Sequence, residues 1–322
     1  MKTINWGIIG LGKIANSFAT DLITVEGSTL YGVASRSQEK ANEFGDKYGA
    51  VKKYDSYEAL ASDPNIDVIY IATPHVKHYT DTIMCLSHRK AVLCEKPFAM
   101  NAGEVEEMIS LAQKNNCLLM EALWTRMMPH FNFVLEELNS GKYGAVKTVT
   151  ADFCFDAPFD PKGRLFDKNL GGGSLLDVGI YPAFCALAIL GKPDSITAKA
   201  KMGKTGVDEE TEATFTYKNG AKAHITSSIV RKTPSIATIV CDKGLIILES
   251  RFHETDKVTV ILDGIKVLHD FKYSAKGYNF EAAHVAELLR EGQTESPMMS
   301  YDFSRLLIET LDDIREKIDL YY

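Results

Sequence analysis

The chain of 322 residues lacks several features that mark particular protein classes. Its six cysteines form no C-x-x-C pair and most stand inside apolar runs, so we expect reduced, buried thiols and no disulfide framework. Lysine and arginine number 36 against 43 acidic residues, which leaves a formal net charge of −7 and no basic stripe. A nucleic-acid-binding protein is therefore not expected.

Targeting and metal-binding signals are also scarce. The start MKTINWGIIGLG lacks a basic region and is interrupted by glycines, and no run approaches the ~18 apolar residues of a membrane span. We therefore expect a cytoplasmic protein with no membrane partner. His75, His78 and the scattered cysteines lack zinc-ligand spacing, so no metal is expected.

The composition that remains is that of a globular protein with a packed core. Hydrophobic residues make up 45% and charged residues 25%, while the length exceeds the roughly 250–300 residues that one core supports. Two domains follow. Residues 1–121 alternate strand-like and helix-like segments, which predicts an α/β Rossmann domain with a doubly wound parallel sheet. Its expected strands are 4–9, 29–34, 68–72, 91–94 and 117–120.

After Glu121 the pattern changes, and residues 122–322 are predicted to form an α+β domain with an open, mainly antiparallel sheet. One helix or two are expected over 123–138, with a possible break near Pro129. Lys218-Asn219-Gly220 is typical of a hairpin turn. Helices are expected at the end of the chain, the last packing back on the first domain. The β-rich stretches are 146–155, 196–202, 212–230, 236–249 and 257–271, and the late helices are 280–290 and 303–320.

The first chemical motif is Gly10-Leu11-Gly12-Lys13-Ile14-Ala15, which fits G-x-G-x-x-G/A where a strand ends and a helix begins. Gly10 permits a tight turn, and Gly12 lets the backbone approach a pyrophosphate. The free N–H groups of the helix N-terminus, from Lys13 and Ile14 onward, attract the phosphates. The motif predicts a dinucleotide site.

The second strand ends in Ala34-Ser35-Arg36-Ser37, without the carboxylate that an NAD site places there for the ribose 2′-hydroxyl. Ser35 can donate to a 2′-phosphate, Arg36 can pair with it, and Lys40 lies one turn further on. NADP is therefore favoured as cofactor, while NAD and dual specificity stay open.

Two further loops follow predicted strands: Ala72-Thr73-Pro74-His75 and Glu95-Lys96-Pro97. Ligands of open α/β sheets bind beyond the carboxyl ends of the strands. We therefore expect Thr73, Pro74, His75, Glu95 and Lys96 to line the cofactor crevice. Pro97 helps to aim the lysine, and a cis bond before it is possible. His78, one turn beyond His75, is interpreted as structural.

Together with Gly171-Gly172-Gly173-Ser174-Leu175-Leu176-Asp177-Val178-Gly179-Ile180-Tyr181, these motifs resemble the glucose-fructose oxidoreductase / inositol dehydrogenase / MocA family over nearly the whole chain. Leu123-Trp124-Thr125-Arg126 followed by Pro129 is most similar to the dimeric dihydrodiol dehydrogenase and NADP-dependent D-xylose 1-dehydrogenase branch of that family.

The resemblance implies an NAD(P)-dependent oxidoreductase that moves a hydride between nicotinamide C4 and a CH–OH or carbonyl group of a small sugar, polyol or dihydrodiol. Lys96 matches the lysine of the family's E-K-P motif, and Asp177 the aspartate of its D-x-x-x-H motif. Tyr181 replaces the histidine of that motif, which favours a tyrosine proton donor. The resemblance also implies a homodimer formed through the C-terminal sheet.

The same chemistry follows from acid–base properties. Free tyrosine and lysine have pKa values near ~10 and ~10.4, and a protonated Lys96 close to Tyr181 would lower the phenol's pKa. The same ammonium would stabilise a developing alkoxide. Asp177 could bond a substrate hydroxyl or orient Lys96; alternatively it is only an N-cap carboxylate.

The remaining pocket candidates rest on weaker signals, since an amphipathic linker helix would show the same pattern around residue 124. The alternative function is a non-catalytic NAD(P)-binding regulator of the same fold, and a third possibility is an oxidoreductase that never releases its cofactor. The residues predicted to wall the substrate pocket are Trp124, Arg126, Phe155, Arg164 and Tyr278.

Overall fold

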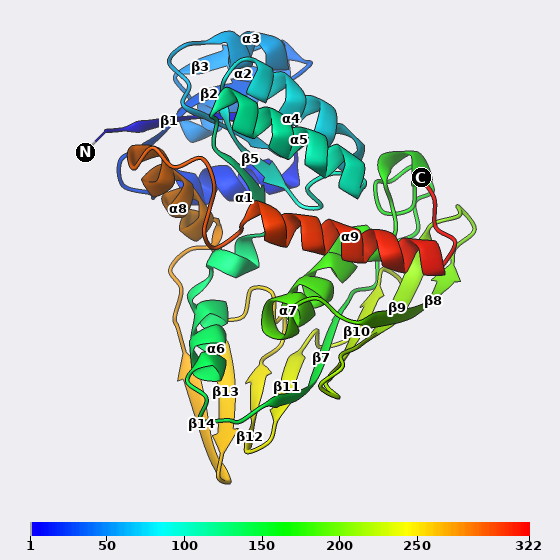
Figure 1. Ribbon diagram of the computed structural model, residues 1–322. Helices are drawn as coiled ribbons and strands as arrows, with labels where there is room; N and C mark the ends of the chain where they lie inside the picture. The colour runs from blue at the N-terminus through cyan, green and yellow to red at the C-terminus, as the bar shows by residue number, and fades with distance from the viewer. Residues whose placement is uncertain (1) are drawn as a thin grey trace. The chain divides into compact units, whose positions relative to one another are not determined.

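The computed structural model describes residues 2–322, which divide into two compact units (Figure 1). The first unit joins the chain up to Met127 with Ser274–Arg305, and the second joins Met128–Tyr273 with Leu306–Tyr322. A late segment of the chain, including one whole helix, therefore belongs to the first unit.

The first unit contains a six-stranded sheet in the order β3-β2-β1-β4-β5-β6, with every neighbouring pair parallel. The predicted doubly wound sheet is confirmed. All four residues of the β4 strand are buried, as expected of a strand covered on both faces. The short third strand was not predicted. The strands are β1 (Ile4–Ile9), β2 (Ser28–Ala34), β3 (Lys52–Tyr54), β4 (Val68–Ile71), β5 (Ala91–Glu95) and β6 (Leu119–Ala122).

Helices connect these strands, and several begin at side-chain caps. Ser37, Ser56 and Asn101 each accept a hydrogen bond from a backbone N–H of the first turn. The Asn101 Oδ1 accepts from the amide of Glu104 at 3.0 Å, and an Asn three residues before a Glu is a common pattern at a helix start. The helical segments of this unit are α1 (Lys13–Leu22), α2 (Gln38–Tyr48), α3 (Tyr57–Ser62), η1 (His75–Lys77), α4 (His78–Ser87), α5 (Ala102–Asn115), η2 (Trp124–Met127) and α8 (Tyr278–Arg290).

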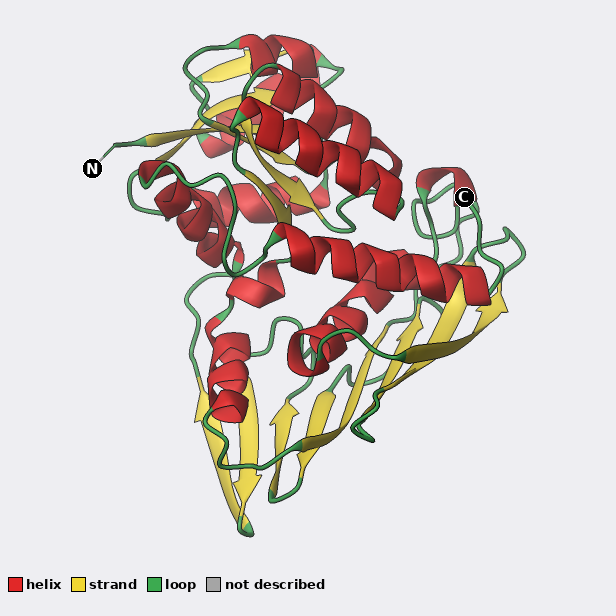
Figure 2. Cartoon of the chain, in the orientation of Figure 1, coloured by secondary structure: helices red, strands yellow, loops and turns green. Residues whose placement is uncertain are grey.

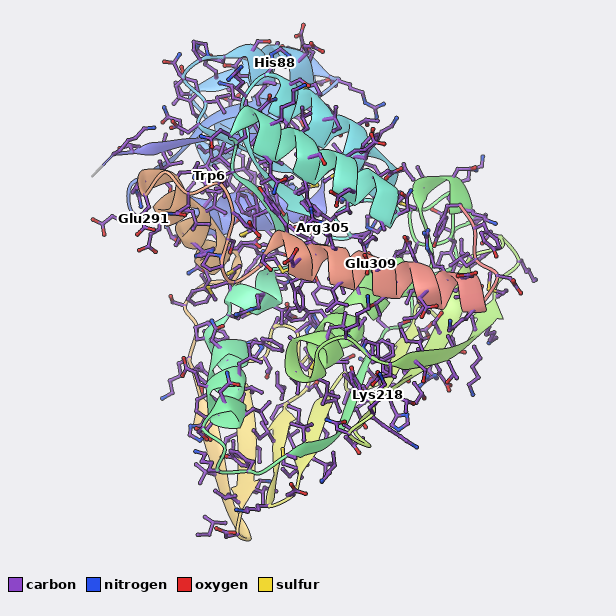
Figure 3. All side chains as sticks on the ribbon, in the orientation of Figure 1. Trp6, His88, Lys218, Glu291, Arg305 and Glu309 are labelled. Carbon is purple, nitrogen blue, oxygen red and sulfur yellow. The ribbon has the colours of Figure 1, made fainter. Side chains whose placement is uncertain are left out.

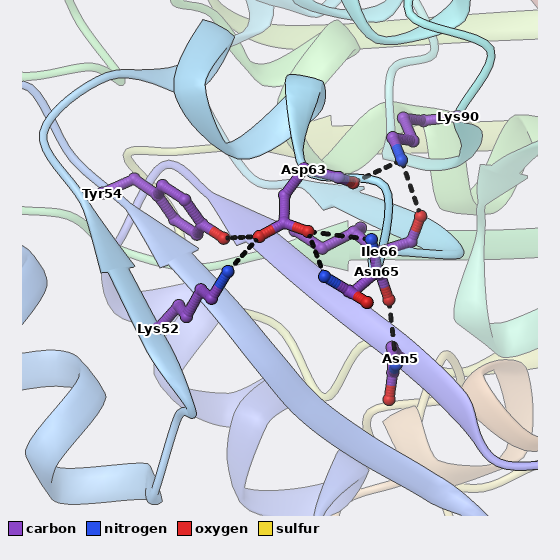
Figure 4. A network of polar contacts seen from close by, with 7 residues as sticks. All are labelled: Asn5, Lys52, Tyr54, Asp63, Asn65, Ile66 and Lys90. Carbon is purple, nitrogen blue, oxygen red and sulfur yellow. Dashed lines mark hydrogen bonds and ion pairs between the residues drawn. The ribbon is translucent and has the colours of Figure 1, made fainter.

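A polar network around Asp63 holds the amino ends of the strands together (Figure 4). The Asp63 carboxylate accepts from Lys52 Nζ at 2.7 Å and from the Tyr54 hydroxyl at 2.6 Å. The buried Lys90 donates to the carbonyl oxygens of Asp63 and Ile66 at 2.5 and 2.9 Å. Burial raises the pKa of Asp63, but the hydrogen bonds from Lys52 and Tyr54 outweigh it and hold the pKa below its usual range. This network lies near the amino ends of the strands, whereas the cofactor site is predicted at their carboxyl ends.

The second unit contains an eight-stranded sheet in the order β14-β13-β12-β11-β7-β10-β9-β8, drawn in yellow in Figure 2. Its pairs are antiparallel except β10 with β7, so the mainly antiparallel prediction is confirmed. The strands are β7 (Val146–Cys154), β8 (Ser195–Met202), β9 (Asp208–Thr216), β10 (Lys222–Ser228), β11 (Ala237–Cys241), β12 (Gly244–Leu248), β13 (Lys257–Leu262) and β14 (Ile265–Asp270).

The two faces of this sheet differ. The helix α7 (Ile180–Leu190) covers one face, on which the buried side chains include Val149, Ala151, Ala223 and Ile225. The opposite face is charged over β8 and β9 and more apolar over β11 to β13. The remaining helical segments are α6 (Pro129–Asn139), η3 (Lys168–Leu170), the π-helix η4 (Leu175–Gly179) and α9 (Tyr301–Lys317), which runs from the first unit into the second.

One stretch corrects the expectation about apolar runs. The stretch Lys168–Leu190, which spans η3, η4 and α7, is long and apolar enough to cross a membrane by length and composition, with a mean hydropathy of 1.7. However, 83% of the 18-residue apolar part of this stretch is buried inside the protein. A core helix of a folded domain has the same properties, so the stretch is only weak support for a membrane span.

Ion pairs cover the surface without determining the fold. Lys218 and Glu309 lie on the outside of the second unit (Figure 3). Lys218 pairs with Asp194 at 3.2 Å, but its side chain is 89% exposed. Pairs this exposed contribute about 0–1 kcal/mol, so the buried contacts decide the stability of the unit.

Candidate active site

The β1–α1 turn has the shape that a dinucleotide needs. Gly10 has φ +82°, and a Cβ there would meet the backbone of Ala72 and Thr73 at 2.5 Å, so only glycine fits. A Cβ on Gly12 would meet nothing within 4 Å. Gly12 is also the N-cap of α1 and has no side chain to cap the first N–H groups. Open space beside an uncapped helix N-terminus suits a pyrophosphate.

The end of β2 carries the candidate 2′-phosphate ligands. The Ser35 hydroxyl accepts from the Ser37 amide at 3.2 Å, and the side chains of Arg36 and Lys40 are exposed. Burial raises the pKa of Asp81 on α4, while a hydrogen bond from Thr73 and the positive charges of Lys77 and Arg36 oppose that rise. Arg36 therefore carries its charge close to the loop after β4.

His78 ties the two loops that were predicted to line the crevice. Its ring is fully buried, with Nδ1 2.7 Å from the Pro97 carbonyl oxygen and Nε2 2.9 Å from that of Thr73. Burial lowers the pKa of His78 to about 4. A neutral imidazole donates from only one nitrogen, so only one of the two carbonyls is satisfied at a time. His75 is half-buried in η1, its ring centre 5.7 Å from that of His78.

The Glu95-Lys96-Pro97 loop is held from several sides. The Lys96–Pro97 bond is cis. Glu95 accepts from the Tyr70 hydroxyl and from the Lys96 amide, the latter at 3.2 Å. The buried Glu121 at the end of β6 accepts from the amide of Phe98 at 3.1 Å. Lys96 itself is half-buried and lies at the carboxyl edge of the sheet, the edge at which the Gly10 turn also stands.

Two of the predicted pocket residues come together in the first unit. The rings of Trp124 on η2 and Tyr278 on α8 stack at 4.4 Å with an angle of 4°. Asp21 of α1 holds the start of α8 by accepting from the amides of Gly277 and Tyr278 at 2.9 and 3.0 Å. Arg126 is half-buried on η2, and burial lowers its pKa.

In the second unit, Asp177 lies inside the π-helix η4. Both terminal nitrogens of Arg164 donate hydrogen bonds to the Asp177 carboxylate, at 2.7 and 3.4 Å. The Asp177 side chain is 7% exposed and that of Arg164 60%. Asp177 is therefore not the N-cap carboxylate considered as an alternative. A π-helical turn is rare in proteins and is frequent at functional sites.

Tyr181, in the first turn of α7, is buried among aromatic rings. Its ring centre lies 5.5 Å from Phe153 and 5.1 Å from His253, which itself stacks on Phe153 at 4.0 Å. Phe155, the predicted pocket residue, packs against a core cluster that includes Phe166, as Phe153 also does. Phe153 faces the same way along β7 and could have been considered, whereas no sequence signal marks His253.

Among residues 2–322, no three His, Cys, Asp or Glu side chains gather closely enough to hold a metal ion.

The fold and the glycine turn define an NAD(P)-binding oxidoreductase. Residues 4–123 match the family model described as "Oxidoreductase family, NAD-binding Rossmann fold", and residues 131–247 match the GFO/IDH/MocA C-terminal domain. The chain therefore belongs to the GFO/IDH/MocA oxidoreductase family, as its motifs indicated.

Its relatives include named enzymes. The chain is 37% identical to the trans-1,2-dihydrobenzene-1,2-diol dehydrogenase of Mus musculus, over 99% of this chain and 98% of that protein. It is 34% identical to the Homo sapiens protein of the same name, with the same coverage.

Solved structures share the fold at lower identity. The aldose-aldose oxidoreductase of Caulobacter crescentus, complexed with glycerol, has a TM-score of 0.90 at 22% identity, covering 99% of this chain and 98% of that one. The 3-ketoreductase KijD10 of Actinomadura kijaniata, in complex with NADP and TDP-benzene, has a TM-score of 0.89 at 22% identity, covering 98% of each chain. These likenesses support the two-sheet fold.

Proposed function

We propose that this protein transfers a hydride between nicotinamide C4 and the CH–OH or carbonyl carbon of a small polyhydroxylated substrate, with Lys96 and Tyr181 handling the proton. The observation that carries the proposal is the fixed lysine: buried groups hold the backbone on both sides of Lys96, at the sheet edge where the glycine turn lies. The names of the relatives support sugars, polyols or dihydrodiols as substrates.

The bound nicotinamide supplies the hydride donor or acceptor. Gly10, Gly12 and the first turn of α1 would hold its pyrophosphate, because a Cβ at Gly12 finds open space and the helix start is uncapped. NADP is the favoured cofactor and NAD the alternative. The 2′-phosphate would be held by Ser35, Arg36 and Lys40, and the rest of the cofactor by Lys13, Ile14, Thr73, Pro74, His75 and Glu95.

The proton chemistry falls to this chain's own side chains. In reduction, the Tyr181 hydroxyl gives its proton to the oxygen that develops negative charge, and the Lys96 ammonium stabilises that oxygen. Such positioned proton transfer contributes about 10²–10⁴-fold to the rate. Asp177, held by Arg164 at 2.7 Å, accepts a hydrogen bond from a neighbouring substrate hydroxyl. Oxidation runs the same steps backwards.

The proposal requires one lysine to be essential for turnover and dispensable for cofactor binding. Lys96→Ala should bind NADPH as the parent does, since the glycine turn is untouched, and should lose at least about 10²-fold in kcat. Turnover is followed at the nicotinamide absorbance with a panel of aldoses, polyols and dihydrodiols, and binding by NADPH fluorescence. Lys114→Ala, an exposed lysine on α5, is the control.

Each other outcome has a meaning. Full turnover by Lys96→Ala contradicts the assigned role. A parent protein that binds NADPH but turns over nothing in the panel favours the regulator, and nucleotide that survives dialysis favours an enzyme that retains its cofactor. If NAD serves at least as well as NADP, and Arg36→Ala leaves that ratio unchanged, the proposed cofactor preference is wrong.

We also propose a cytoplasmic homodimer that pairs through the open face of the eight-stranded sheet. Val240 is 41% exposed on β11, and its neighbours on that face, Leu245, Ile247 and Ile261, are only partly covered. Contiguous apolar surface of this kind is typical of an interaction site. The six cysteines, all free and buried, are compatible with a reducing compartment.

A further inference from the structure

A second buried carboxyl group lies under the Asp177–Tyr181 segment. Asp208, the first residue of β9, is fully buried. Its Oδ2 accepts three hydrogen bonds: from the Ser174 hydroxyl at 2.8 Å, the Leu175 amide at 2.7 Å and the Thr211 hydroxyl at 2.7 Å. Leu175 is the first residue of the π-helix η4. Asp208 therefore caps the helix that carries Asp177.

The other carboxylate oxygen of Asp208 has no such support. Among the described residues, Oδ1 has no hydrogen-bond partner. It packs against Gly173, where an added Cβ would lie 2.1 Å from it and where φ is +124°. The Tyr322 hydroxyl lies 3.1 Å from the same added Cβ and donates to the Gly172 carbonyl at 2.6 Å. Asp208 and Tyr322 thus both pack against the glycine-rich stretch before the helix.

This arrangement is unfavourable for stability. Burial raises the pKa of Asp208 to about 6, although hydrogen bonds from Thr211, Ser174 and Leu175 oppose the rise. An unfolded aspartate has a pKa near ~3.9, so the folded protein binds more protons between pH ~4 and ~6 and loses stability as the pH rises through that window. A buried ionised group that costs stability at neutral pH is typical of a functional site.

We propose that Asp208 is a positioning residue: its ionised carboxylate fixes the start of η4 and thereby the places of Asp177 and Tyr181. The proposal rests on the proposed function of those two residues. The ionisable groups around this stretch are Tyr322, the Arg315 guanidinium that lies over the Tyr322 ring at 5.5 Å, and the Asp177–Arg164 pair. The hydroxyls that face the carboxylate are those of Ser174 and Thr211, with Ser227 behind Ser174.

The proposal predicts that kcat falls at acidic pH (the acid limb of the pH–rate profile) because Asp208 becomes protonated. As the carboxylate is protonated it becomes a weaker acceptor for the Leu175 amide, so kcat of the parent falls below pH ~6. Asp208→Asn should have a kcat about 10-fold lower at pH 8 and no such limb, with a denaturation midpoint at pH 8 no lower than the parent's. Glu212→Gln, on the solvent-facing side of the same strand, is the control and should match the parent.

A second variant tests in which direction the pH dependence of kcat moves when the pKa of Asp208 changes. Thr211→Val removes one hydrogen bond to the charged form and so raises the pKa of Asp208, which should move the acid limb to higher pH by about one unit. A limb that stays in place in both variants would overturn the proposal. So would an Asp208→Asn protein whose kcat falls only in proportion to its loss of folded protein, because that is a purely structural role.

Hydrogen exchange separates this proposal from the proposed function. In the parent, protection of the amides over 174–181, corrected for intrinsic rates, should rise about 4-fold from pH 8 to pH 5.5, because an opening that returns Asp208 to water must give up a proton that the buried carboxyl group binds more tightly. In Asp208→Asn it should not change with pH. This readout needs no turnover. If no substrate is found, the proposed function fails while the exchange measurement still decides on Asp208; equal protection at both pH values in the parent refutes the proposal.

Discussion

Glu121 is a single residue whose ionisation bears on the whole first unit. Its side chain is fully buried, with one oxygen accepting from the Phe98 amide at 3.1 Å and the other from the Ser304 hydroxyl at 2.8 Å. Burial raises the pKa of Glu121 to about 7 against these two hydrogen bonds. Its ordinary value is near ~4.3, so the folded state binds the extra proton between these pH values.

The sign of the resulting pH dependence is fixed. Where the folded state binds more protons, the free energy of unfolding falls as the pH rises, so Glu121 costs stability progressively from pH ~4.3 to ~7. Glu121→Gln keeps an acceptor for Phe98 and can donate to Ser304. We expect it to gain roughly 2–3 kcal/mol over the parent between pH 5 and pH 8, measured by urea unfolding at each pH.

The control for this prediction is Glu291→Gln, an exposed carboxyl group at the end of α8 that is labelled in Figure 3. Its difference from the parent should stay constant over the same range. A Glu121→Gln protein whose difference from the parent is flat with pH would show that Glu121 is ionised in the folded protein.

At the scale of the element, the β1–α1 turn offers two glycines with opposite expectations. Gly10→Ala places a Cβ 2.5 Å from the backbone of the β4 loop at φ +82°, so we expect a loss of several kcal/mol in stability. The Cβ of Gly12→Ala would have no atom within 4 Å, and Gly12 has φ −88°, which any residue can adopt. We therefore expect this variant to be as stable as the parent.

The same Gly12→Ala methyl group occupies the space proposed for the pyrophosphate. We therefore expect weaker NADPH binding, by about 10-fold or more, with an unchanged melting temperature in the absence of cofactor. Titration by NADPH fluorescence and thermal unfolding check the two parts. Unchanged affinity would place the pyrophosphate elsewhere.

Local signals explain which elements were predicted well. Strands such as Ile4–Ile9 and Val68–Ile71 are short apolar runs followed by glycine or a Thr-Pro turn, and Gly220 closes the β9–β10 hairpin with φ +87°. The strand β3 (Lys52–Tyr54) was missed because three residues with two lysines carry no periodic pattern. The β6 strand begins two residues later than expected, at Leu119.

At the scale of the whole molecule, the proposed dimer makes a direct prediction. Val240→Glu puts a charge in the middle of the apolar part of the sheet face, where burying it unpaired would be costly, so the variant should be a monomer. Molar mass by light scattering decides. Thr197→Glu, at an exposed position on β8 in the charged part of the same face, should leave the parent's mass unchanged.

The test requires that the parent protein is a dimer at micromolar concentration. We expect this because a stable protein–protein interface buries about 1,200–2,000 Å² in total, and the proposed face offers an extended apolar surface. A monomeric parent, or a dimeric Val240→Glu protein, contradicts pairing through this face.

The sequence by itself determined the features that depend on neighbours along the chain. The Gly10–Gly12 turn, the Asn101 cap, the break at Pro129 and the Lys218–Gly220 hairpin each follow from backbone preferences over a few residues. The motifs around Lys96 and Tyr181 indicated the family for the same reason, because they are contiguous.

Only the tertiary structure decided contacts between distant segments. The parallel pairing of β10 with β7, the grip of Arg164 on Asp177 and the cap that Asp21 gives to α8 join residues with no pattern between them. The burial of Asp208 and Glu121 likewise depends on what the fold packs around each carboxyl group. A side chain's pKa and its partners are set by the surroundings that remove it from water, and those surroundings exist only once the chain has folded.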